Sequence, residues 1–269
     1  MRSLLLLLMV LLSQMICGAQ ELYVNTEPAS NMAAKSVGLR LANREWFSSG
    51  RVKDRFSPEI MLGISKRWMV HLEGSMANYN TAKVKPESIN LYGKYRFYSV
   101  DGVQSHFRTA FYSRVSYSRN KGFIDELNPE GDVSGLSSGF IVTQLLHKLA
   151  LSSTVGLSKV FASPSFVSGE AYNYSFSAGY LLYPRTYTNY KQVNVNLYLE
   201  LLGKSNPGIN EENVSVQKGS NLALAPALQL IFNSQTRFDI GYKFDVYNSG
   251  TQMGNMLLVR LEYNLFNVW

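Results

Sequence analysis

The chain has 269 residues, of which 46% are hydrophobic and 13% aromatic, and its formal net charge is +7. Its 26 lysine and arginine residues are spread along the chain without a basic block, which argues against a nucleic-acid-binding protein. Cys17 is the only cysteine, so no disulfide framework or set of thiolate metal ligands is available. No linker or change in composition divides the chain, and its length suits one large all-β domain.

The first residues have the pattern of a secretory signal peptide. Arg2 precedes the apolar run 4–12, and the small residues Cys17, Gly18 and Ala19 stand just before Gln20, an order that predicts export and cleavage after Ala19. A membrane-anchor helix would need about 20 apolar residues, more than this run supplies. A lipid anchor on Cys17 is disfavoured because the bulky Ile16 precedes it. Cleavage removes the only cysteine, which excludes thiolate catalysis in the mature chain.

Residues 20–35 form a leader ahead of the first predicted strand, and contain Tyr23 and Glu27. Two interpretations are open for this periplasmic segment. It either folds into the interior of the following domain as a plug, or stays a loose tail, which is the more usual state of a chain terminus.

Twelve stretches alternate between apolar and polar side chains, the pattern of a strand with one apolar and one polar face. They cover residues 36–44, 59–65, 68–78, 88–98, 105–118, 136–146, 149–160, 173–183, 192–202, 221–232, 236–247 and 257–269. Their lengths are near the roughly 9 to 11 residues with which a tilted strand crosses a bilayer.

The connections between these stretches alternate in length. The long polar connections are 45–58, 79–87, 119–135, 161–172, 203–220 and 248–256. The short connections are 66–67, 99–104, 147–148, 184–191 and 233–235. An even strand number with short periplasmic turns and longer extracellular loops is typical of transmembrane barrels. We therefore predict an all-β, antiparallel, up-and-down transmembrane β-barrel of twelve strands over residues 36–269.

The alternation also assigns the two faces of each strand. In the stretch 68–78, Trp68 and Leu72 share one face, and His71 and Glu73 share the other. A lysine or arginine facing lipid near the middle of the membrane costs about 2 to 4 kcal/mol. The apolar face is therefore expected to meet lipid, and the ionic residues to line the interior.

Two stretches fit this scheme poorly. Residues 136–146 carry apolar side chains on both faces, and 221–232 contains Pro226, which cannot donate a ladder hydrogen bond. A count of ten or fourteen strands is therefore an open alternative. A soluble β-sandwich would also show alternation, but the signal peptide and the unequal connections disfavour it.

The end of the chain carries a further pattern. Its last stretch places Leu261, Tyr263 and Leu265 on one face, and the chain stops at Trp269. This ending resembles the C-terminal assembly signal of small, porin-like outer-membrane β-barrels of Gram-negative bacteria, and the start at Gln20 is similar to that of exported Bacteroidetes proteins. The resemblance implies an integral outer-membrane protein that contacts outer-membrane lipid and the barrel-assembly machinery. It carries over no functional residue.

The predicted inward positions divide by charge. The expected basic wall comprises Arg40, Lys94, Arg96, Arg108 and Arg114, and the expected acidic wall comprises Glu200, Asp239, Asp245 and Glu262. Facing walls of opposite sign would set up a field across a narrow pore. This favours a channel for small polar or anionic solutes. The alternative is a non-conducting structural or surface-binding barrel whose charges pair into a salt-bridged lumen.

Catalytic and metal-binding patterns are weak. The three histidines are His71, His106 and His147, and the topology places none near the outer rim, where barrel hydrolases keep theirs. No nucleophile elbow, metalloprotease helix or phosphate-binding loop stands in the required context. His71 and Glu73 share a face, but two side chains are a poor metal site. We expect no enzymatic activity, no metal and no cofactor.

Overall fold

The computed structural model describes residues 23–48, 51–78, 83–119, 133–161, 169–186, 191–207, 209–211, 214–216, 219–249 and 255–269. Within these ranges the chain forms fourteen β-strands. The strands are β1 (Ser36–Ser48), β2 (Arg51–Gly63), β3 (Trp68–Ala77), β4 (Lys85–Gly102), β5 (Ser105–Ser118), β6 (Gly135–Leu146), β7 (Leu149–Val160), β8 (Gly169–Tyr183), β9 (Asn194–Asn206), β10 (Ile209–Glu211), β11 (Val214–Val216), β12 (Gly219–Phe232), β13 (Thr236–Ser249) and β14 (Asn255–Leu265). No helix in the described part is long and apolar enough to cross a membrane.

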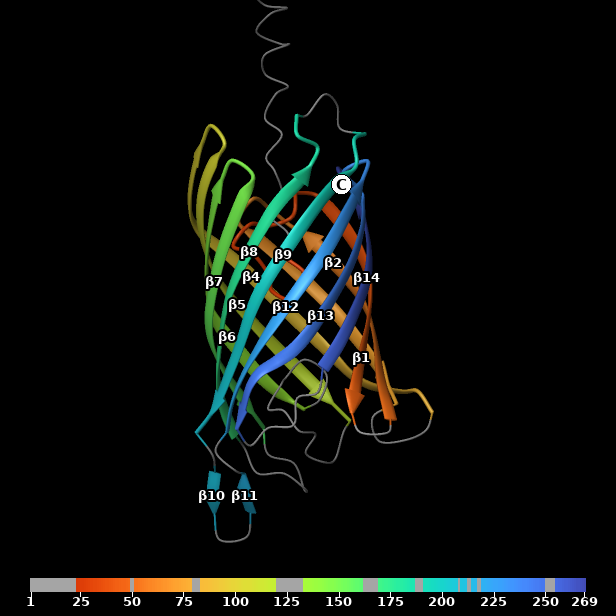
Figure 1. The fold of residues 1–269 in the computed structure, drawn as a ribbon, viewed down its shortest axis with the longest axis vertical. Coiled ribbons are helices and arrows are strands. Elements are labelled where there is room, and N and C mark those ends of the chain that lie inside the picture. The colour runs from red at the N-terminus through yellow and green to blue at the C-terminus, as the bar shows by residue number, and fades with distance from the viewer. Residues whose placement is uncertain are drawn as a thin grey trace, which may run out of the picture.

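Twelve of these strands close into one barrel, in the order β1-β14-β13-β12-β9-β8-β7-β6-β5-β4-β3-β2 (Figure 1). Strand β1 closes it by pairing antiparallel with β2 on one side and with β14 on the other. Strands β10 and β11 form a separate hairpin. The predicted antiparallel barrel of twelve strands is confirmed, and the alternatives with ten or fourteen strands are wrong.

Side chains alternate between the lumen and the outer surface. In β3, Trp68 and Leu72 are 50% and 46% exposed, whereas His71 and Glu73 are 2% and 8% exposed. Because the wall is a single sheet, a buried side chain on a strand points into the lumen and an exposed apolar one points outward. The predicted division of faces is confirmed, and the outer surface is apolar as the exterior of a membrane barrel must be.

The two ends of the barrel differ. Three tight connections, β4 to β5, β6 to β7 and β12 to β13, lie at the end that carries the C-terminus, which we call the turn end (Figure 1). In these turns Gln104, His147 and Asn233 have positive φ angles of 59°, 54° and 52°, which tight hairpin turns require. The β10–β11 hairpin lies beyond the opposite end, which we call the loop end.

The prediction of a long connection over 45–58 is wrong. Strands β1 and β2 run in register until only residues 49 and 50 separate them. Arg55 is buried in the lumen while Val52 is exposed on the outside. The alternation therefore continues through this stretch, with the cationic Arg44 and Arg55 in inward positions and Glu45 and Asp54 on the other face. Charge density alone gives the appearance of a loop.

The two prolines inside strands keep ladder pairing on one side only. Pro58 is matched with Leu41 of β1, and Pro226 with Leu199 of β9. Neither has a matched partner on its other neighbour, β3 or β13 respectively. Proline lacks the N–H that a second ladder would use. One such position interrupts a ladder locally and does not end the strand.

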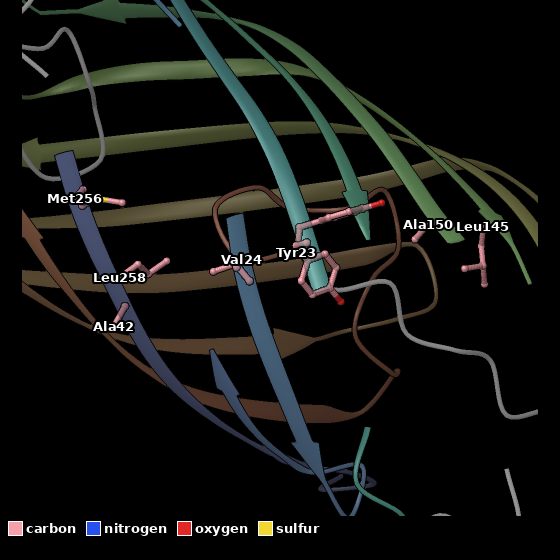
Figure 2. Packing of buried hydrophobic residues seen from close by; sticks show 9 residues of the cluster. Tyr23, Val24, Ala42, Leu145, Ala150, Met256 and Leu258 are labelled. Atoms are coloured by element: carbon pink, nitrogen blue, oxygen red, sulfur yellow. The ribbon is translucent and has the colours of Figure 1, made fainter. Parts of the chain in front are cut away.

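The apolar core lies inside the barrel. Ile141 on β6 is buried with Ala29, and Leu145 belongs to a buried cluster with Tyr23 and Val24 (Figure 2). This explains why β6 is apolar on both faces: its inward side chains contribute to apolar clusters with residues that precede β1.

The C-terminal residues pack back onto the start of the barrel. The predicted strand 257–269 ends at Leu265, and the backbone N–H of Val268 donates to the carbonyl of Lys35 at 2.8 Å. Trp269 is exposed at this end.

Candidate functional site in the barrel lumen

Residues 23–35, which we call the inner segment, lie inside the barrel at its turn end. Among their contacts are Met69 on β3, Thr143 on β6 and Arg237 on β13, each within three residues of the turn end of its strand. Figure 2 shows Tyr23 and Val24 between the strands that surround them. Because these contacts come from opposite sides of the wall, the inner segment occupies this half of the lumen.

Glu200 on β9 holds the start of the inner segment. One carboxylate oxygen accepts from the backbone amides of Val24 and Asn25, at 3.0 and 2.8 Å, and from Asn25 Nδ2 at 3.2 Å. The other accepts from the amide and hydroxyl of Thr26, both at 2.9 Å. Hydrogen bonds to an ionised acceptor are the strong ones, so this fully buried carboxylate is the main anchor.

Cations hold the carbonyl groups of the same segment. The guanidinium of Arg260 donates to the carbonyls of Val24 and Tyr23, at 2.9 and 2.8 Å. The ammonium of Lys94 donates to the carbonyls of Pro28 and Ser30, at 2.6 and 2.8 Å. Non-helical backbone can persist inside a barrel only if its polar groups find such partners.

The charges of this half pair with one another. Arg40 lies 2.8 Å from Glu262, 3.0 Å from Glu59 and 3.2 Å from Glu27. Burial favours the neutral form of Glu27, but Arg40 and Lys94 together hold its pKa at about 2. Glu27 is therefore a carboxylate at physiological pH.

The adjacent wall repeats this pairing. Asp239 accepts from Arg237 at 2.9 Å and from Arg260 at 2.6 Å. Since β1 is the neighbour of β14, Arg40 lies directly opposite Glu262. The expected separation into a basic and an acidic wall therefore does not hold at the turn end, where residues of both signs alternate around the circumference.

The other predicted pore residues are scattered. Arg108 donates to Asp101 and to Ser30 Oγ at the turn end, and Arg96 is half-buried. Arg114 lies over the ring of Tyr92, 5.2 Å from its centre. Asp245 is half-buried and accepts a hydrogen bond from Asn248 at 3.3 Å.

A cavity of about 260 Å³ lies on the loop side of the inner segment, and we call it the loop-end cavity. Residues 25–27 line its floor, while Lys204 and Asn221 lie within two residues of the loop ends of their strands. Among the described residues that line it, five are cationic and Glu27 alone is acidic. The cationic residues are Arg44, Arg55, Arg114, Lys204 and Lys243.

No protein-family model and no curated protein matches the chain by sequence. Solved structures match it in three dimensions. An outer membrane channel from Pseudomonas putida F1 aligns with a TM-score of 0.65 and 8% identity, over 90% of this chain and 100% of that chain. The porin NanC aligns with a TM-score of 0.52 and 13% identity, over 85% of this chain and 100% of that chain. The fold is that of an outer-membrane β-barrel.

Arg55 and Arg237 are among the inward residues of this outer-membrane barrel that the sequence-based assignment of the lumen leaves out. Arg55 falls in the stretch predicted as a loop. Arg237 shares the parity of Asp239 and was recoverable from the alternation alone. Both are buried. The proposed assembly-signal residues Leu261, Tyr263, Leu265 and Trp269 are exposed on the outside.

The histidines do not form a catalytic constellation in the described part of the outer-membrane barrel. His71 is buried on β3, with Nδ1 2.6 Å from a carboxylate oxygen of Glu59, a structural ion pair or hydrogen bond. His106 lies 2.9 Å from Asp101 at the turn end. Within the described ranges no group of three or more His, Cys, Asp or Glu side chains could hold a metal ion.

Proposed function

We propose that this protein is an outer-membrane channel of the porin type, for small anionic solutes. The observation that carries the proposal is the loop-end cavity, where five cationic side chains and one acidic side chain line the inside of a closed barrel. A pore lined by one sign of charge concentrates solutes of the opposite sign. The fold it shares with an outer membrane channel and with a porin supports the same class.

Location follows from the same proposal. The apolar exterior suits outer-membrane lipid, the N-terminal pattern suits a signal peptide removed after Ala19, and the aromatic C-terminus suits recognition by the barrel-assembly machinery. The barrel acts without a cofactor and without catalysis in this proposal.

The inner segment acts as the plug of this channel. It fills the turn end, so a solute in the loop-end cavity meets residues 25–27 before it reaches the periplasm. Conductance should therefore be small while Glu200 and Arg260 hold the segment, and should rise when it is displaced.

A second candidate is a barrel that does not conduct. The observation that favours it is the paired set around Arg40 and Asp239, which fills the turn end with neutralised charge. Such a barrel would stabilise the membrane or present its loops to a partner.

The test is ion conduction by the refolded mature chain in a planar bilayer under a KCl gradient. A variant that lacks residues 20–32 keeps the hydrogen bond from Lys35 N to Gly63 O and removes most of the plug. We expect current steps with a reversal potential that favours chloride, and larger steps from the deletion variant.

If that variant fails to fold, Glu200→Ala in the full chain serves the same purpose. Silence from folded wild type and folded variant would overturn the channel and favour the second candidate. A reversal potential that favours potassium would overturn the preference for anions.

A further inference from the structure

Two donors that line the loop-end cavity have no partner among the described residues. Lys243 on β13 lines it and is 6% exposed, and it has no hydrogen bond or ion pair within the described ranges. Nδ2 of Asn221 on β12 is buried in the same wall, and it too lacks a partner among the described residues. Buried polar groups in folded proteins are normally satisfied. Within the described ranges the protein supplies no acceptor to either donor, so an anion in the lumen would give both of them a partner.

On β1 and β2, the charged side chains that line the cavity are both cationic. Arg44 on β1 and Arg55 on β2 are direct cross-strand partners, and like charges in that position repel. Arg55 is 3.1 Å from the carboxylate of Glu87. Among the described carboxylates, Arg44 contacts Glu73 alone, at a long 3.9 Å, and its guanidinium also donates to Ser57 Oγ at 3.2 Å. An anion in the cavity would relieve this repulsion.

The opposite wall is polar but uncharged. Strands β6, β7 and β8 lie across the barrel from β13, β14, β1 and β2. Among their described side chains that line the cavity, the polar ones are Ser137, Thr154, Ser158, Asn173 and Ser175. Asn173 Nδ2 donates to Ser158 Oγ at 2.6 Å, and Ser158 Oγ donates to Ser137 Oγ at 3.1 Å. Hydroxyl groups both donate and accept, so this wall matches the hydroxyl groups of a solute.

We infer that the loop-end cavity binds a single small organic anion that bears several hydroxyl groups, with its acidic group toward Lys243 and Arg44 and its hydroxyl groups toward β6–β8. A sugar acid is the matching chemical class. The volume of about 260 Å³ is below the roughly 300 to 1,000 Å³ of drug-sized ligand sites, which fits one sugar unit rather than a chain. This inference rests on the proposed channel and names its solute class.

Calorimetric titration of the full mature chain in detergent micelles tests it, with D-glucuronate and D-glucose as probes. Glucuronate should bind at least about tenfold more tightly than glucose, because only glucuronate supplies an ionised acceptor. Lys243→Gln should weaken glucuronate binding by about tenfold or more. Lys243→Arg keeps the charge and should stay within a few-fold of wild type.

The matched control is Lys159→Gln, since Lys159 is exposed and its charge pairs with Glu170 outside the cavity. Its affinity for glucuronate should equal that of wild type. Absence of glucuronate binding, equal binding of the two sugars, or an unchanged Lys243→Gln affinity would each overturn the inference. Chloride current without glucuronate binding would sink the inference and leave the channel standing. Glucuronate binding without current would overturn the proposed channel and leave the binding site standing.

Discussion

Glu200→Ala should release the inner segment from the wall of the barrel. The carboxylate accepts five hydrogen bonds from residues 24–26. At about 1.5 kcal/mol each these bonds would sum to about 7 kcal/mol, but the freed donors regain water when the segment leaves. We therefore expect a loss of about 3 to 5 kcal/mol, as for other buried charged partners. At about 1.4 kcal/mol per factor of ten, the undocked fraction should rise by a hundredfold to several thousandfold.

Cysteine accessibility measures this fraction directly. Ala29 is fully buried in the inner segment, and the predicted mature chain has no cysteine of its own. In an Ala29→Cys background, a water-soluble thiol reagent should label the Glu200→Ala protein far faster than the parent. Glu170→Ala, which removes an exposed carboxylate from the neighbouring strand β8, should label at the parental rate. Equal labelling of the Glu200→Ala protein and its parent, both folded, would refute the anchoring role.

Three further predictions concern the wall. Leu199→Arg places a charge on the outer face of β9 and should lower the free energy of unfolding in lipid vesicles by about 2 to 4 kcal/mol; an unchanged urea midpoint would contradict a lipid-facing position. Ile141→Ala opens a cavity beside Ala29 and should cost about 2 kcal/mol, measured in the same assay, while equal stability would show that the two do not pack. Gly203→Ala directs a methyl group at the ring of Tyr174, which is exposed on the outer surface; it should destabilise by about 1 to 3 kcal/mol, and a neutral result would mean that the ring moves freely.

Alternation was sufficient to predict most of the fold because each strand is solvated differently on its two faces. His71 and Leu72 are adjacent in sequence, yet one is buried and the other lies on the outer surface. No long-range information is needed to separate them. The first half of β2 is not predicted from the sequence, because Pro58 and a run of charged residues have the composition of a loop. There charged residues occupy both faces, with Arg55 inward and Asp54 outward, so parity is a better guide than polarity.

The lumen was less predictable because its contacts join residues far apart in the chain. An apolar side chain on the inner face at Ile141 is explained only by Ala29, more than a hundred residues earlier, which packs against it. Arg40 and Glu262 were assigned to separate walls, although closure makes β1 and β14 neighbours. Arg40 and Glu262 are far apart in sequence, but closure of the barrel makes them cross-strand neighbours. The leader gave no periodic signal, since its order depends on partners such as Glu200.

Joining the first strand to the last imposes an order on biogenesis. Strand β1 is the first barrel strand to be synthesised, yet its second partner is β14. The β1–β14 ladder therefore cannot form until the last strand has been synthesised and exported. Throughout that interval two strand edges stay unpaired, and unpaired edges promote aggregation. The inner segment must also enter the lumen before β1 pairs with β14, or enter later through an open end of the barrel.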